Sequence, residues 1–127
     1  MSEAVTRGIR ISVRAHFVPE HSDPDEDRYF FAYHVTIANE GKVATQLLSR
    51  HWIITDGSGE VREVKGAGVI GQQPTLAPGE AFEYTSACPL PTPVGSMYGT
   101  YGMLAVSGDR FDARIAPFTL ALPSALN

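Results

Sequence analysis

The amino-acid sequence predicts an all-β protein, an antiparallel β-sandwich of about seven strands. Three observations predict it: apolar residues alternate with polar ones over several long stretches, Gly and Pro punctuate the chain between them, and no stretch has the periodicity of an amphipathic helix. Strands joined by turns, without helices, bury their apolar faces as two facing sheets. The 127 residues, 43% hydrophobic and 19% charged, suit a single globular domain spanning residues 1–127. We expect frayed termini over about residues 1–7 and 122–127.

The first two strands show the clearest alternation. Apolar residues occupy every second position of Ile9–Phe17 and again of Tyr29–Ile37. Their polar neighbours therefore lie on the outward face of the sheet. If the two strands form a hairpin through Pro19–Arg28, Ser12 faces roughly His34. The turn Asn39–Lys42 follows.

The third strand, Ala44–Thr55, breaks the alternation. Leu47-Leu48 and Ile53-Ile54 are adjacent apolar pairs, which indicates either a bulge or a strand covered on both faces. The segment Asp56–Gly59 then predicts a hairpin connection into a strand at Glu60–Val64.

The remaining strands lie in the C-terminal half. Pro78-Gly79 is the residue pair that a type II turn favours. A strand containing Phe82 and Tyr84 follows this turn, and Met97–Val106 is the next strand. The last strand begins at Phe111 and runs past Pro117 to Leu120.

Charge and cysteine usage narrow the class of protein. Ten basic and fourteen acidic residues give a net charge of −4, which provides no general attraction to nucleic acid or to an anionic membrane. One cysteine, Cys88, excludes an internal disulfide framework. The N-terminus lacks the apolar core of a signal peptide and no segment reaches transmembrane length, so we expect a cytoplasmic protein. We also expect no cofactor.

A glycine run, Gly66-Ala67-Gly68-Val69-Ile70-Gly71, fits the dinucleotide-binding pattern GxGxxG after a predicted strand. The usual motif also needs a helix to begin at its last glycine, and Pro74 and Pro78 disfavour one here. Two interpretations stay open: an anion-binding nest of backbone N–H groups at Gly66, Gly68 and Gly71, or a loop whose glycines supply positive φ.

Arginines offer a second candidate for anion binding. Arg10 and Arg14 lie on the outward face of the first strand with His16, and could clamp a pyrophosphate together with the glycine run. The alternative is a solvated sheet face whose charges prevent aggregation.

Metal-binding and catalytic patterns are weak. Asp23, Asp25 and Asp27 could hold a hard cation, yet the run lacks the calcium-loop glycine and is more typical of a solvated loop. The four histidines have no metal-ligand spacing. Cys88 and Ser86 lie in no nucleophile elbow, so we expect no enzyme.

Prolines 89, 91 and 93 stiffen the segment Cys88–Met97. A long ordered connection on a sandwich is a common place for binding, and it could equally be a crossover fixed to the core. The candidate protein-binding residues are Leu90, Pro91, Pro93, Val94 and Met97.

Three ordered segments together resemble the bacterial ApaG family. They are Leu47–Asp56, the glycine run followed by Gln73-Pro74, and Pro78–Gly99, within a likeness that extends from about Ile9 to Leu120. Ala87 departs from the glycine expected there. The resemblance implies an immunoglobulin-like or fibronectin type III-like sandwich, a link to cobalt resistance and magnesium efflux, and, through related domains in F-box and polymerase-interacting proteins, a protein-interaction role. It carries over no catalytic residue.

Two functional hypotheses follow. The first is a non-catalytic module that binds another protein through the proline-rich segment and the neighbouring sheet face. The second is a sensor of a phosphorylated compound, such as a nucleotide, pyrophosphate or dinucleoside polyphosphate, or of a magnesium or cobalt ion, through the glycine run with Arg10 and Arg14. An exposed edge strand would also permit a homodimer.

Overall fold

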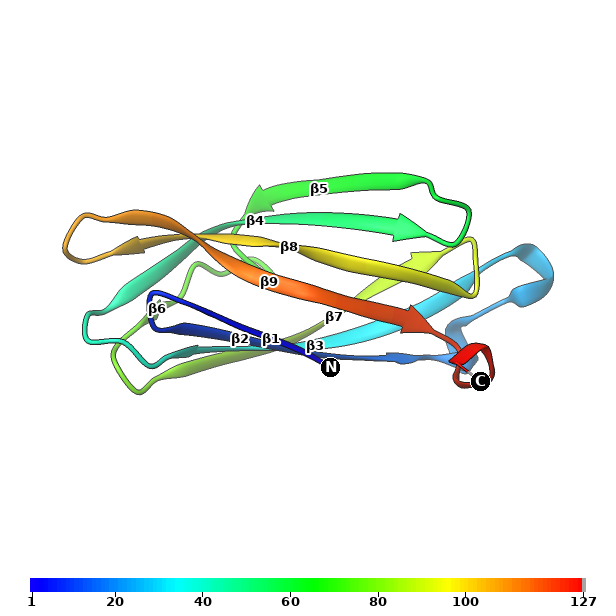
Figure 1. The fold of residues 1–127 in the computed structure, drawn as a ribbon, viewed down its shortest axis with the longest axis horizontal. Helices are drawn as coiled ribbons and strands as arrows, with labels where there is room; N and C mark the ends of the chain where they lie inside the picture. Colours follow the sequence, from blue (N-terminus) through cyan, green and yellow to red (C-terminus); the bar gives the residue numbers. More distant parts are fainter. Residues whose placement is uncertain (127) are drawn as a thin grey trace.

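The structure, a computed structural model, describes residues 1–126 and consists of two antiparallel sheets packed face to face (Figure 1). The predicted all-β antiparallel sandwich, immunoglobulin-like or fibronectin type III-like, is confirmed. Instead of about seven strands, nine are found in residues 1–126, because β1 and β6, defined below, were not predicted.

The first sheet contains four strands in the spatial order β1 (Ser2–Thr6), β2 (Ile9–Phe17), β3 (Tyr29–Asn39) and β7 (Ala81–Leu90). The predicted hairpin of Ile9–Phe17 with Tyr29–Ile37 is confirmed as β2 and β3, and its connection holds two short 3-10 turns, Pro19–His21 and Pro24–Glu26. The predicted register is shifted by two residues from the observed one. Ser12 lies opposite Thr36, not His34, and Arg14 lies opposite His34.

The second sheet has the order β5 (Val61–Ala67), β4 (Thr45–Asp56), β8 (Val94–Ala105) and β9 (Arg110–Ala121), with β6 (Thr75–Leu76) paired to the start of β4. The type II turn before β7 is confirmed: Gly79 has φ +89°, and the Glu80 N–H donates to the Ala77 carbonyl over 2.9 Å. The last strand does run past Pro117.

The N-terminus differs from the prediction. Ser2–Thr6 is not frayed but forms β1, paired antiparallel with β2 from Ser2 opposite Val13 to Thr6 opposite Ile9. The short turn at Arg7-Gly8 allows this pairing, because both residues adopt positive φ. At the other end Pro123–Leu126 forms a 3-10 turn, and Asn127 lies outside the described residues.

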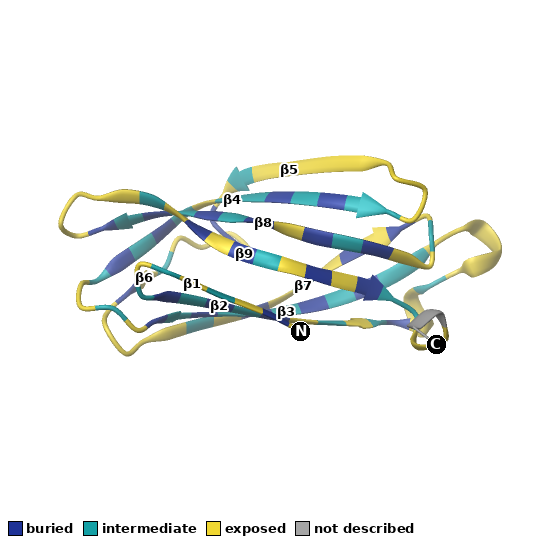
Figure 2. Cartoon of the chain, in the orientation of Figure 1, coloured by how far each residue is buried: buried dark blue, intermediate teal, exposed yellow. Residues whose placement is uncertain are grey.

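The core lies between the two sheets. Along the longer strands buried residues alternate with half-exposed or exposed ones, whereas β5 is exposed over most of its length (Figure 2). Trp52 is at the centre, with edge-to-face contacts to Tyr33, Tyr101 and Phe118. These rings come from both sheets and hold them together.

The two long sides of the sandwich are not equivalent. On one side β1 and β2 pack against β9. On the other side the outermost strands are β5 and β7, each of which pairs with one neighbour only. No helix in the described 126 residues is long and apolar enough to cross a membrane.

Candidate functional site

A cleft of about 250 Å³ opens between the sheets on the side of β5 and β7. Its walls come from β3, β4, β5, β7 and β8. The polar groups of the lining are Arg50, Arg62, Tyr33, Ser86 and Cys88. The lining contains no Asp or Glu, so its formal charges are both positive.

A β-bulge turns Arg50 into this cleft. Leu47 pairs with Met103 and Ser49 pairs with Gly102, so Leu48 is the extra residue in β4. The bulge confirms one of the two interpretations of the broken alternation, and it moves the inward positions from odd to even numbers. Arg50 therefore shares the inner face of β4 with Trp52 and Ile54.

The Arg50 guanidinium is held by the end of β5. Its Nη1 donates to the carbonyl oxygens of Ala67 and Gly68, both over 3.0 Å. Gly66 lies opposite Arg50 in the sheet, and a Cβ atom on it would be 2.7 Å from Nη2 of Arg50. Because Gly66 has no side chain, the Arg50 guanidinium can occupy the space that a Cβ atom would take.

Arg62 reaches across the mouth of the cleft. Its Nη2 donates to the Pro89 carbonyl over 3.3 Å, which joins β5 to β7. No carboxylate oxygen of residues 1–126 lies within 4.0 Å of the guanidinium nitrogens of Arg50 or Arg62. Two cations thus share one cleft without a counter-charge.

The deep wall of the cleft is uncharged. Burial raises the pKa of the Tyr33 phenol, and Ser86 and Arg50 offset this effect in part. Burial also raises the pKa of the Cys88 thiol, although Arg62 opposes it. Both groups are therefore neutral at pH 7, and the wall offers hydrogen bonds rather than a negative charge.

The glycine run lies beside the cleft, but several of its N–H groups already form hydrogen bonds within the protein. The Gly68 N–H donates to the Leu48 carbonyl, and Val69 and Gln72 bond each other through their backbones. Between them Ile70 and Gly71 have φ of +41° and +77°, as in a type I′ turn. The glycines of the run therefore allow the tight turn and leave room for the Arg50 guanidinium. Whether the N–H groups outside these bonds, including those of Ile70 and Gly71, bind an anion stays a prediction.

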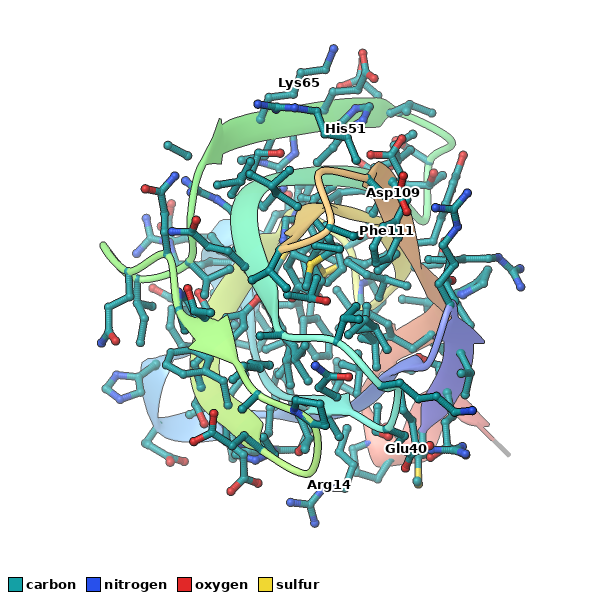
Figure 3. All side chains as sticks on the ribbon, turned by 90° about the vertical axis from the view of Figure 1, so that its left-hand side faces the viewer. Arg14, Glu40, His51, Lys65, Asp109 and Phe111 are labelled. Carbon is teal, nitrogen blue, oxygen red and sulfur yellow. The ribbon has the colours of Figure 1, made fainter. Side chains whose placement is uncertain are left out.

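Arg10 and Arg14 do not meet the glycine run, so the combined site predicted from them is wrong. Both lie on the outer face of the first sheet, whereas the glycine run belongs to the second. Figure 3 shows Arg14 at the opposite side of the molecule from Lys65. Arg10 already pairs with Glu40 at 2.9 Å and Glu3 at 3.2 Å, and the hydrogen bond to Glu40 raises the pKa of its guanidinium.

The proline-rich segment is a short crossover between the two sheets that is fixed to the core, the second of the two interpretations drawn from the sequence, and not a long connection. Residues 88–90 complete β7 and residues 94–97 begin β8, leaving only Pro91–Pro93 between them. Leu90 and Met97 are 2% and 1% exposed, because they point into the core. Only Pro91, Pro93 and Val94 of the predicted docking residues are at the surface.

The remaining candidate residues, acidic side chains and histidines, do not come together in one site. Asp23, Asp25 and Asp27 lie in the exposed β2–β3 connection, and no group of three His, Cys, Asp or Glu side chains within the described chain is arranged to hold a metal ion. His51 lies on the outer face, where its Nε2 is 2.8 Å from Glu63.

Arg50 and Arg62 are not among the site residues predicted from the sequence. The signal for Arg50 was present in the adjacent pair Leu47-Leu48, because a bulge there reverses which residues point inward. No local signal indicates that Arg62 spans the cleft, since its partner Pro89 is on the other sheet.

Comparison with known proteins gives concordant results. The sequence profile described as the ApaG domain, DUF525, matches residues 19–105. The chain is 57% identical to Protein ApaG of Aromatoleum aromaticum and 59% identical to Protein ApaG of Anaeromyxobacter dehalogenans, each over 100% of both chains. It is similar to the crystal structure of a Bordetella pertussis protein described as ApaA, with a TM-score of 0.88, 55% identity and 95% of each chain covered.

Proposed function

This chain belongs to the ApaG domain family, and we propose that it is a non-catalytic β-sandwich module that binds a small anion, such as a phosphorylated compound, in the cleft between β5 and β7. One observation carries the proposal: Arg50 and Arg62 line a single cleft that contains no carboxylate. Of the two hypotheses drawn from the sequence, this is the second, with the arginines of the second sheet in place of Arg10 and Arg14.

Arg50 carries a half-buried charge without a counter-ion in residues 1–126, whereas Arg62 is exposed at the mouth of the cleft. A guanidinium withdrawn from water without a counter-ion costs free energy, and a bound anion recovers it through charge-assisted hydrogen bonds. Arg50 is only half-buried and uses Nη1 on two backbone carbonyls, which leaves its Nε and Nη2 groups for a ligand. The planar fork of arginine suits phosphate and carboxylate oxygens.

The chemistry of the lining supports binding without a reaction. Cys88 is 3% exposed, and burial keeps its thiol protonated at neutral pH. Ser86 has no histidine or carboxylate beside it in the cleft lining. A bound anion would therefore meet hydrogen-bond donors and no activated nucleophile.

An amide and arginine side-chain NMR titration tests the proposal. Inorganic phosphate and pyrophosphate are added at constant ionic strength, with and without magnesium. We expect localised shifts at Gly66, at Ser86 and at the Nε–Hε groups of Arg50 and Arg62. Arg50→Gln and Arg62→Gln should each weaken pyrophosphate binding about ten-fold, since each removes one charge-assisted contact.

Arg14→Gln is the matched control, because Arg14 is an exposed arginine on the outer face of the other sheet. It should bind pyrophosphate as the wild type does. Shifts that are spread over all exposed arginines, or a loss of affinity in Arg14→Gln equal to that in Arg50→Gln, would contradict a specific site.

A further inference from the structure

The free edge of β7 forms one lip of the cleft. The Asn39 N–H donates to the Glu80 carbonyl over 2.9 Å, which fixes the hydrogen-bonded phase of the β3–β7 pairing. Bonded and non-bonded positions alternate in an antiparallel pair, so the even-numbered residues of β7 bond β3. The backbone groups of Glu83, Thr85 and Ala87 therefore point away from the sheet, and no strand within residues 1–126 pairs with them.

Two observations agree with this assignment. Pro89 has no N–H, and it occupies an outward-facing position of β7, where a strand tolerates proline. The Pro89 carbonyl accepts its hydrogen bond from Arg62, which lies beyond the edge. The edge thus already binds one donor from outside its own sheet.

Between Glu83 and Pro89 the exposed edge of β7 lacks the usual protection, because the charged residue and the proline lie at the two ends of this segment. Natural edge strands are commonly blocked by charges, prolines or bulges. From Tyr84 to Cys88 the strand has no charged residue and no proline, and its pairing with β3 is continuous. By contrast β5, the other lip of the cleft, carries Arg62, Glu63 and Lys65.

From these features we infer that β7 accepts an extended segment of a partner protein as an added strand, with an acidic side chain directed inward to Arg50 and Arg62. Main-chain hydrogen bonds to an exposed edge supply affinity, and alternate side chains supply specificity. The charge of the cleft selects an anionic side chain, Asp, Glu or a phosphorylated residue. The inference rests on the proposed function, since the same two arginines would bind the anionic group.

Binding of an added strand would replace the Arg62–Pro89 hydrogen bond by a backbone hydrogen bond to Pro89 and an ion pair to Arg62. The Arg62–Pro89 hydrogen bond now spans the mouth of the cleft at 3.3 Å. An added strand would place its own N–H groups against the outward carbonyls of β7, including that of Pro89. The released Arg62 guanidinium would then pair with the acidic side chain, so a contact to a neutral carbonyl is replaced by one to an anion.

Peptide binding by the intact protein tests the inference. The probes are end-blocked heptapeptides with Asp, Glu or phosphoserine at the centre and varied residues elsewhere, beside a matched set with Asn, Gln or Ser at the centre. We expect the acidic set to bind at least about ten-fold more tightly. On binding, the amide protons of Thr85 and Ala87 should become protected from hydrogen exchange. Equal binding of both sets, no binding by either set, or binding without this protection would overturn the inference.

A variant and a chemical control test the role of the backbone. Ala87→Pro removes one outward N–H at a position of the same type as Pro89, and Ala87 makes no backbone bond to β3 there, so the fold should be retained. It should weaken the binding of acidic peptides about ten-fold. Because Ala87 also lines the cleft, pyrophosphate binding by this variant should fall less than peptide binding. If the variant is unstable, N-methylation of alternate peptide amides gives the same test with the wild-type protein, and an unaffected affinity would count against strand addition.

The two proposals fail separately. If pyrophosphate shifts Gly66 and Ser86 while no acidic peptide binds, strand addition is wrong and the anion site stands. If neither ligand binds, both are wrong. If the free protein sediments as a dimer with the Thr85 and Ala87 amides already protected, the edge is covered by a second copy, which overturns the partner-protein inference.

Discussion

At the scale of single residues, the candidate site depends on one absent side chain. Gly66 has an ordinary strand conformation rather than positive φ, so its conformational freedom is not what the structure uses. What it provides is room for the Arg50 guanidinium. Gly59, near the other end of β5, has the opposite character: φ is +91°, and a Cβ atom there would meet nothing within 4 Å.

Gly66→Ala should separate binding from stability. The new methyl group would displace the end of the flexible Arg50 side chain, so we expect pyrophosphate affinity to fall several-fold while the free energy of unfolding changes by less than about 1 kcal/mol. Titration calorimetry and urea denaturation measure the two quantities.

The control is Gly59→Ala, which should lose about 1 kcal/mol of stability, because alanine is strained at positive φ, and should bind normally. A Gly66→Ala protein with wild-type affinity would show that the position of Arg50 does not matter for the ligand.

At the scale of elements, Asn39 joins three segments at the end of β3. Its side chain is 1% exposed, and its Nδ2 donates to the carbonyls of Val43 and Leu76, both over 2.9 Å. Its Oδ1 accepts from the Gly41 N–H. The residue therefore fastens the β3–β4 connection and β6 to the sandwich, a role that its place beside a predicted turn does not reveal.

Asn39→Ala should destabilise the protein by about 1–3 kcal/mol, because it removes three hydrogen bonds of one buried side chain, including the buried one to the Leu76 carbonyl. Chemical denaturation gives the difference in free energy of unfolding. Gln46→Ala is the comparison, since the Gln46 amide donates to the Gln73 carbonyl at an exposed site and its loss should cost no more than about 0.5 kcal/mol. Similar losses for both variants would mean that the Asn39 bonds are not structural.

At the scale of the whole molecule, buried tyrosines join the two sheets. Tyr84 of β7 and Tyr101 of β8 share a hydrogen bond between their hydroxyl groups inside the sandwich. Burial raises the pKa of both phenols, and that of Tyr33 beside them. The folded protein therefore resists ionisation of these groups more strongly than the unfolded chain does.

Stability should consequently fall at high pH. Below the unfolded tyrosine pKa of about 10, the phenols are neutral in both states and their contribution is fully present. Above it, the unfolded chain releases protons that the folded protein retains, so the free energy of unfolding decreases as pH rises. Urea denaturation at several pH values between about 8 and 11 measures the slope.

The double variant Tyr84→Phe, Tyr101→Phe should show a shallower slope, because it removes both ionisable groups without leaving one hydroxyl unpaired. Tyr98→Phe, which changes an exposed phenol, serves as the control. If the double variant and wild type lose stability equally between pH 10 and 11, these tyrosines do not account for the alkaline effect.

Local sequence determined most of the fold. Alternation over Ile9–Phe17 and Tyr29–Ile37 is a property of neighbouring residues, and so are the turn at Pro78-Gly79 and the irregularity at Leu47-Leu48. Strand identity and the sandwich class could therefore be predicted. Short strands such as β1 and β6 escaped, because their pairing depends on partners rather than on their own pattern.

Only the tertiary structure decided the candidate site. Arg10 and Arg14 looked suitable in sequence, but the pairing of strands places them on the wrong sheet. Arg50 enters the cleft because a bulge reverses its face, and Arg62 completes it because β5 and β7, separated in the chain, become facing edges. Periodicity fixes which face of a strand is apolar, whereas the meeting of two edges depends on how whole sheets pack, and no short stretch of sequence encodes that.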